Sequence, residues 1–187
     1  MAEVNDLQTV AANNTARFPE GMTAAQLNDN LRELEAMIGR YHRDHTGVGL
    51  TTGTGTALVL TAYRTVAALA AGYEFTFRCH VAVGTSPTLQ VNGLTAKSMV
   101  HVGNLPIMSG DIAISQMVRA IYNSSLDKFE VVGAMPAVLP TFTVATVPSA
   151  ATFVRRQIYV SDESGGAIVA FSDGTNWRRL TDRAVIS

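Results

Sequence analysis

Apolar residues recur at alternating spacings of four and three positions over residues 24–42. They are Leu27, Leu31, Leu34, Ile38 and Tyr41. This spacing is the a/d pattern that packs one side of a helix against another helix in a coiled coil. Thr23 and Gln26 form a capping-box motif, so we expect the helix to begin at Ala24 and to run to about His42.

We call these five apolar residues the seam. The seam is narrow, whereas a helix that lies on a globular core usually has a wider apolar face. The pattern therefore favours self-association of the helix. Packing of an amphipathic helix on its own domain is the alternative.

The pattern changes to β-structure after a Gly- and Thr-rich stretch at 46–56. Residues 73–81 alternate between apolar and polar positions, as expected for a strand with one buried side. Further short strands are predicted at 57–61, 88–91, 97–102, 112–122 and 129–132. Asn92-Gly93 is a hairpin signal, and the apolar run at 112–122 suggests a central strand. We expect an antiparallel β-sandwich or small barrel over residues 46–135.

A second β-segment follows Pro136 and Pro140, which bracket a predicted linker. Strands are expected at 157–161, 167–171 and 177–180, with turns between them. Such a short segment cannot hold a core alone, so it must pack on the middle domain, on symmetry mates or on another protein.

The predicted fold class is mainly β with one N-terminal α-helix. The expected domains are an arm at 1–17, a trimerising helix at 18–45, the β-sandwich at 46–135 and a small C-terminal β-domain at 136–187. The polar arm is either a docking segment or a frayed terminus.

Composition excludes several classes of function. Charged residues make up 16% of the 187 residues, below the roughly 25% of ordinary soluble proteins, which favours burial against partners. A net charge of −1 provides no basic field for nucleic acid. Cys79 is the only cysteine, so no intramolecular disulfide or Cys-rich zinc site is possible. We expect no membrane insertion and no secretion signal, hence folding in the cytoplasm.

Three stretches of the chain carry motifs of a known kind. The first is Phe18-Pro-Glu-Gly-Met22 through Leu31-Arg-Glu33 to Arg43-Asp44. The second is Phe75-x-Phe77-Arg78, Thr88-Leu-x-Val-Asn92-Gly93, Gly110-Asp111 and Tyr122. The third is Tyr159 to Gly166 with Phe171 to Arg179. Together they resemble virion fibre proteins of tailed bacteriophages, of the tail-fibre or head-fibre type. Phe18 stands where the family has Trp.

That resemblance implies a homotrimer with a virion location and supplies no catalytic residues. Two clusters of potential ligands remain: His42, Asp44 and His45 near the end of the helix, and Asp162, Glu163 and Asp173 in predicted turns. The histidines could bind a metal on a trimer axis, or form a solvated helix end. The second cluster is either a set of calcium ligands or ordinary turn chemistry. No cofactor and no enzymatic activity are expected.

Trp177, Arg178 and Arg179 form a candidate contact patch, because an aromatic and arginines often anchor interfaces. The alternative is that Trp177 lies in the core of the end domain, with Arg178 pointing outward.

We therefore expect a structural component of a phage virion, a trimeric tail-fibre-like protein that mediates host attachment or assembly of the tail tip. The alternatives are a capsid-attached head fibre or decoration protein, a carbohydrate-binding receptor module, and a small polysaccharide-degrading enzyme. The expected partners are copies of the chain itself, other virion proteins of the tail or capsid, and a host-surface glycan or protein.

Overall fold

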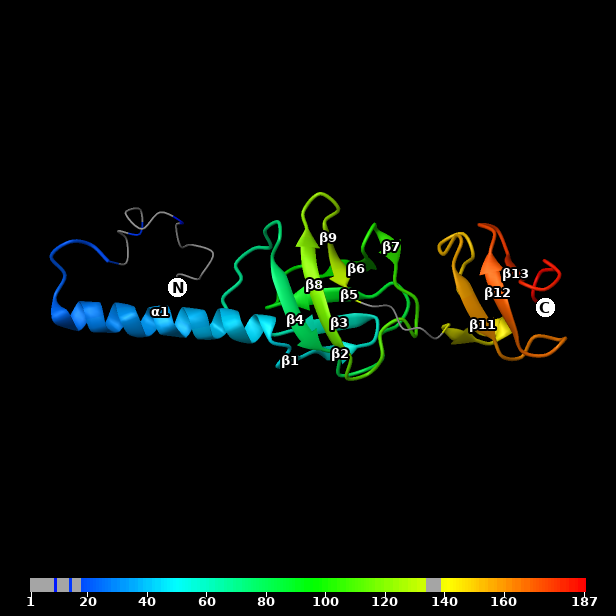
Figure 1. Ribbon diagram of the computed structural model, residues 1–187, viewed down its shortest axis with the longest axis horizontal. Helices are drawn as coiled ribbons and strands as arrows, with labels where there is room; N and C mark the ends of the chain where they lie inside the picture. The colour runs from blue at the N-terminus through cyan, green and yellow to red at the C-terminus, as the bar shows by residue number, and fades with distance from the viewer. Residues whose placement is uncertain (1–8, 10–13, 15–17, 134–138) are drawn as a thin grey trace.

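The computed structural model describes residues 9, 14, 18–133 and 139–187. Within them, a long helix, a β-domain and a smaller end sheet follow one another along the longest axis of the molecule (Figure 1). The described part is mainly β with a single α-helix near its N-terminal end, as predicted. Most of the predicted arm at 1–17, and Pro136 of the predicted linker, lie outside the described residues.

Helix α1 (Ala24–His45) begins where the sequence predicts. The Gln26 N–H donates to Thr23 Oγ1 at 3.3 Å and the Thr23 N–H donates to Gln26 Oε1 at 2.9 Å, so the capping box is confirmed. The helix ends three residues later than expected, at His45. Basic side chains in its last turn favour this end, because they face the negative end of the helix dipole.

The β-domain is built from nine strands. They are β1 (Gly49–Leu50), β2 (Thr52–Thr54), β3 (Ala57–Leu60), β4 (Glu74–Arg78), β5 (Thr88–Val91), β6 (Lys97–His101), β7 (Leu105–Pro106), β8 (Met117–Asn123) and β9 (Lys128–Val132). Their order is β1-β4-β8-β9-β6-β5-β3-β2, with β7 beside β6. Strands β1 and β2 stand at opposite ends of this order but are separated only by Thr51. The sheet therefore curves back on itself.

The prediction of a purely antiparallel arrangement is wrong. The pairs β1–β4, β3–β5 and β6–β9 are parallel, so the sheet is mixed. Each parallel pair joins strands that are not consecutive in the chain. Local patterning cannot indicate such pairing, because it is decided by long-range packing.

The core of the β-domain follows the alternation expected from the sequence. In β4, Phe75 and Phe77 are fully buried, and the ring of Phe129 in β9 meets Phe75 edge-on at 6.3 Å between centroids. Strand β8 begins at Met117, five residues later than predicted, and its buried and exposed positions alternate. It is central, between β4 and β9, but it is not apolar on both faces.

The end sheet has the order β10-β11-β12-β13. Its elements are β10 (Thr141–Phe142), a 3-10 turn η3 (Val144–Thr146), β11 (Gln157–Val160), β12 (Ile168–Ser172) and β13 (Trp177–Arg179). The three predicted strands are confirmed, and the two-residue β10, which pairs in parallel with β11, was not predicted.

The end sheet packs on the β-domain through Met108 and Asp111. Met108, from the loop before β8, is fully buried in the hydrophobic core of the end sheet. The Asp111 carboxylate accepts from Arg156 at 2.6 Å and from the Met108 N–H at 2.9 Å, and lies 2.9 Å from His101 Nε2. Burial alone would raise the pKa of Asp111, but these bonds and the charge of Arg156 hold it below its usual value.

Candidate association surface

The seam of α1 is uncovered in the single chain. The exposed fractions are 42% for Leu27, 47% for Leu31, 55% for Ile38 and 39% for Tyr41. Leu34, at the middle of the seam, is half-buried. Large apolar side chains in a row along one helix face make this face a candidate contact surface.

A different face of the same helix packs on the chain itself. Met37 is fully buried and Asp44 is 5% exposed. Successive residues of a helix are rotated by about 100°, which places Met37 and Asp44 roughly a quarter-turn away from the centre of the seam. The most buried positions of the helix therefore lie beside the seam and not at its centre.

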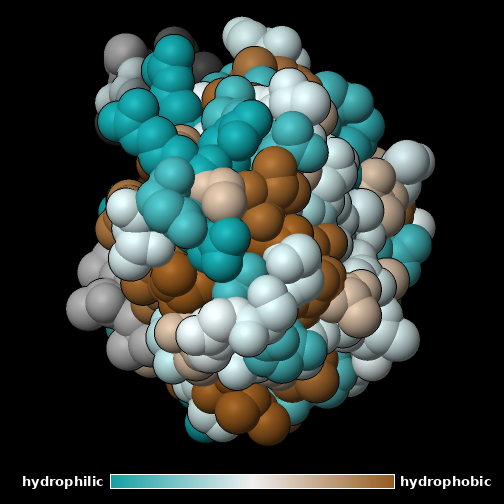
Figure 2. Space-filling model, turned by 90° about the vertical axis from the view of Figure 1, so that its right-hand side faces the viewer, coloured by the Kyte–Doolittle hydropathy of each residue, from teal (hydrophilic) through white to brown (hydrophobic). Residues whose placement is uncertain are grey.

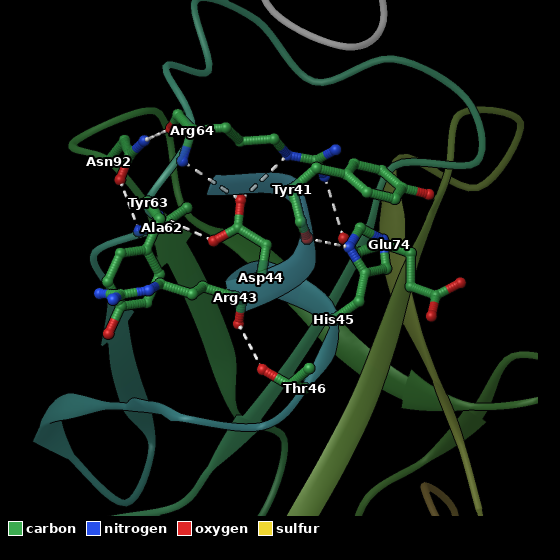
Figure 3. A network of polar contacts seen from close by, with 10 residues as sticks. All are labelled: Tyr41, Arg43, Asp44, His45, Thr46, Ala62, Tyr63, Arg64, Glu74 and Asn92. Carbon is green, nitrogen blue, oxygen red and sulfur yellow. Dashed lines mark hydrogen bonds and ion pairs between the residues drawn. The ribbon is translucent and has the colours of Figure 1, made fainter. Parts of the chain in front are cut away.

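Asp44 attaches the last turn of α1 to the β-domain (Figure 3). Its carboxylate accepts the N–H of Tyr63 at 2.7 Å and the N–H of Arg64 at 3.3 Å. Arg64 Nε lies 3.3 Å from Oδ2 with the geometry of an ion pair and not of a hydrogen bond. Burial raises the pKa of Asp44, and the two N–H groups and the charge of Arg64 oppose that rise.

Arg64 is equally enclosed, with its side chain 4% exposed. Its Nη2 donates to the carbonyl of Glu74 at 2.9 Å. The guanidinium lies over the rings of Phe75 at 4.7 Å, Tyr73 at 5.0 Å and Tyr41 at 5.9 Å. Tyr41 thus lies at the boundary between the seam and the helix–domain contact.

The Asn92-Gly93 hairpin supports this contact through the side chain of Asn92. Both residues have positive φ, 47° and 76°, as a type I′ turn requires, so the predicted hairpin is confirmed. The Asn92 side chain accepts the N–H of Ala62 at 2.8 Å and donates to the carbonyl of Arg64 at 2.9 Å. The hairpin residues were visible in the sequence, but their partners in the 62–64 loop were not.

The predicted ligand clusters are used structurally. Asp44 binds the 63–64 backbone, and the ring of His45 lies 4.1 Å from that of Tyr41. Glu163 pairs with Arg179. Across residues 18–133 and 139–187 no three His, Cys, Asp or Glu side chains gather as a metal site would require.

Asp173 accepts backbone hydrogen bonds within its own turn. Its carboxylate accepts the N–H groups of Thr175 and Asn176 at 2.8 and 2.7 Å and also contacts Arg178. The Asn176 N–H, then Arg178, then the Thr175 N–H lower the pKa of Asp173 to about 2.

The predicted contact patch divides between the two faces of β13. Trp177 is 4% exposed and its Nε1 donates to the carbonyl of Pro148 at 2.6 Å, so it belongs to the core. Arg179 shares the inner face and pairs with the buried Glu163 at 3.3 Å. The prediction of an exposed stacking surface at Trp177 is therefore wrong. Arg178 lies on the outer face, because side chains alternate along a strand.

No protein-family model matches the chain, and no curated protein matches it. None of the helices in the described part of the chain is both long and apolar enough to span a bilayer.

Proposed function

We propose that this chain is one subunit of a homotrimeric fibre, a structural component of a phage virion. Three α1 helices would pack in parallel along Leu27, Leu31, Leu34 and Ile38. The observation that carries the proposal is the exposed seam on a helix whose buried residues, Met37 and Asp44, lie beside the seam.

Burial of the seam would favour association. Fully burying a Leu or Ile side chain stabilises by about 1.5–3 kcal/mol, so covering one that is half-exposed contributes about 1 kcal/mol. Several such residues in each of three chains contribute favourably to the free energy of association. The number three comes from the resemblance to fibre proteins, because the mixture of Leu, Ile and Tyr in the seam does not select one oligomer.

The linear arrangement of helix, β-domain and end sheet supports a projecting role (Figure 1). The helix, with its seam, is at one end of this line, and the C-terminus is at the other. We propose that the fibre attaches to a host surface or helps to assemble the tail tip, without catalysis.

Analytical ultracentrifugation tests the trimer. The wild type is expected at three times the chain mass of 19.9 kDa. Leu31→Asp with Ile38→Asp places like charges along the axis and is expected to sediment as a single chain. Ala36→Asp is the matched control, because this exposed position lies on a helix face away from the seam.

The proposal is contradicted if the seam variant keeps the mass of the wild type, or if the wild type is monomeric at micromolar concentration. Circular dichroism establishes that each variant retains its β-structure. Antibody labelling of purified particles tests the virion location, and absence of the chain from particles would refute it.

A further inference from the structure

The outer face of the end sheet carries an open groove of about 910 Å³. Its apolar lining comes from Val154, Phe171 and Leu180, and its basic lining comes from Arg155, Arg178 and Arg183. Phe171 pairs with Gln157 on β11 and with Arg178 on β13, so these three side chains share one face of the sheet. The C-terminal end of the molecule shows hydrophobic side chains gathered between hydrophilic ones (Figure 2).

The groove is locally basic although the chain as a whole has a net charge of −1. Against its three guanidinium groups the lining offers one carboxylate, that of Asp173. Asp173 already contacts Arg178 and two backbone N–H groups. Arg155 and Arg183 are exposed, and neither forms an ion pair with another described residue.

Both of these arginines stand on constrained backbone. Arg155 has φ +66° and Arg183 has φ +61°, a region that costs a non-glycine residue roughly 1 kcal/mol or more. The Arg155 N–H donates to the carbonyl of Ser172 at 3.1 Å, and the Arg183 N–H donates to that of Arg179 at 3.0 Å. Arg178 Nη1 donates to the Arg183 carbonyl at 3.0 Å. The two turns are therefore fixed beside the groove.

We propose that this groove binds an acidic saccharide, with its carboxylate groups on Arg155 and Arg183 and the C–H face of a sugar ring on Phe171 and Leu180. Guanidinium groups bind carboxylates in a bidentate manner, and Gln157 can bond to hydroxyls. The site goes beyond the proposed function, and a single chain contains all of it.

An acidic peptide fits the groove less well than a saccharide. Peptides that bind sheets commonly add a strand to a free edge. Beside the groove, Arg178 of β13 already bridges to Val185, so that edge is occupied. The groove lies over the face of the sheet and offers side chains, not strand hydrogen bonds.

Isothermal titration calorimetry with oligogalacturonate and with oligosialic acid tests the site in the full chain. The methyl ester of oligogalacturonate is the uncharged probe of matched shape. Arg155→Gln with Arg183→Gln is expected to weaken binding of the acidic probe tenfold or more, and the methyl ester is expected to bind at least tenfold more weakly than the acid.

Arg32→Gln with Arg78→Gln removes the same charge from exposed positions outside the groove and is expected to change affinity less than twofold. The proposal is overturned if both variants lose affinity equally, if polyglutamate binds as tightly as the saccharides, or if the wild type binds neither acidic saccharide. Sedimentation of the same samples reports the oligomeric state, so failure of this site is distinguished from failure of the trimer.

Discussion

Asp44→Ala probes the attachment of α1 to the β-domain. The substitution removes the acceptor of two backbone N–H bonds and the countercharge of Arg64, whose side chain is 4% exposed. Removing one partner of a buried ion pair costs about 3–5 kcal/mol, because the remaining charge stays buried without compensation. We therefore expect a loss of about 3–5 kcal/mol in the free energy of unfolding.

Urea unfolding at pH 7, followed by circular dichroism, measures this loss. Asp29→Ala is the matched control on the same helix. Asp29 lies 3.8 Å from Arg32 with both side chains largely exposed, and such a pair contributes about 0–1 kcal/mol. The seam is unchanged in both variants.

A double-mutant cycle isolates the pair itself. Arg64→Leu is destabilising alone, but in the Asp44→Ala background no buried charge remains on either side. The double variant is therefore expected to lose less than the sum of the two single losses. Strict additivity, or a loss below about 1 kcal/mol for Asp44→Ala, would refute the role given to this ion pair.

Four further predictions concern the joint between the domains, the core, helix α1 and one turn. Asp111 has a lowered pKa, so its contribution to stability is present at neutral pH and is lost as the pH falls below about 4. Urea unfolding from pH 7 to pH 3 should show this loss, and the free energy of unfolding of Asp111→Asn should depend less on pH over the same range. Burial raises the pKa of Cys79 to about 11, so a thiol reagent at pH 8 should label it only on unfolding. Rapid labelling of the native chain would contradict the burial of Cys79 in the core of the β-domain. The Cβ that Gly39→Ala adds to α1 would meet no atom within 4 Å, so this substitution should stabilise the fold by about 0.5–1 kcal/mol. Gly53→Ala should destabilise by at least about 1 kcal/mol in urea unfolding, because its Cβ would lie 2.3 Å from the Ala57 carbonyl oxygen at φ +92°.

The elements that depend on neighbouring residues could be predicted from the sequence alone. Thr23 and Gln26 cap the helix because both partners lie within one turn. The alternation in β4 places Phe75 and Phe77 on one side of the strand, and Asn92-Gly93 closes a hairpin through two positive φ angles. These features rest on backbone geometry and local hydrogen bonds.

Which elements meet depends on long-range packing. The parallel pairing of β6 with β9 and the burial of Met108 in the core of the end sheet depend on residues far apart in the chain. Trp177 could have faced either side of β13, and its neighbours in the packed sheet placed it inside. Asp44 could have been a solvated helix end, and it is buried because the backbone at residues 63–64 donates to it. A charged or aromatic side chain takes its role from the partners that folding brings to it, and those partners have no fixed spacing in the sequence.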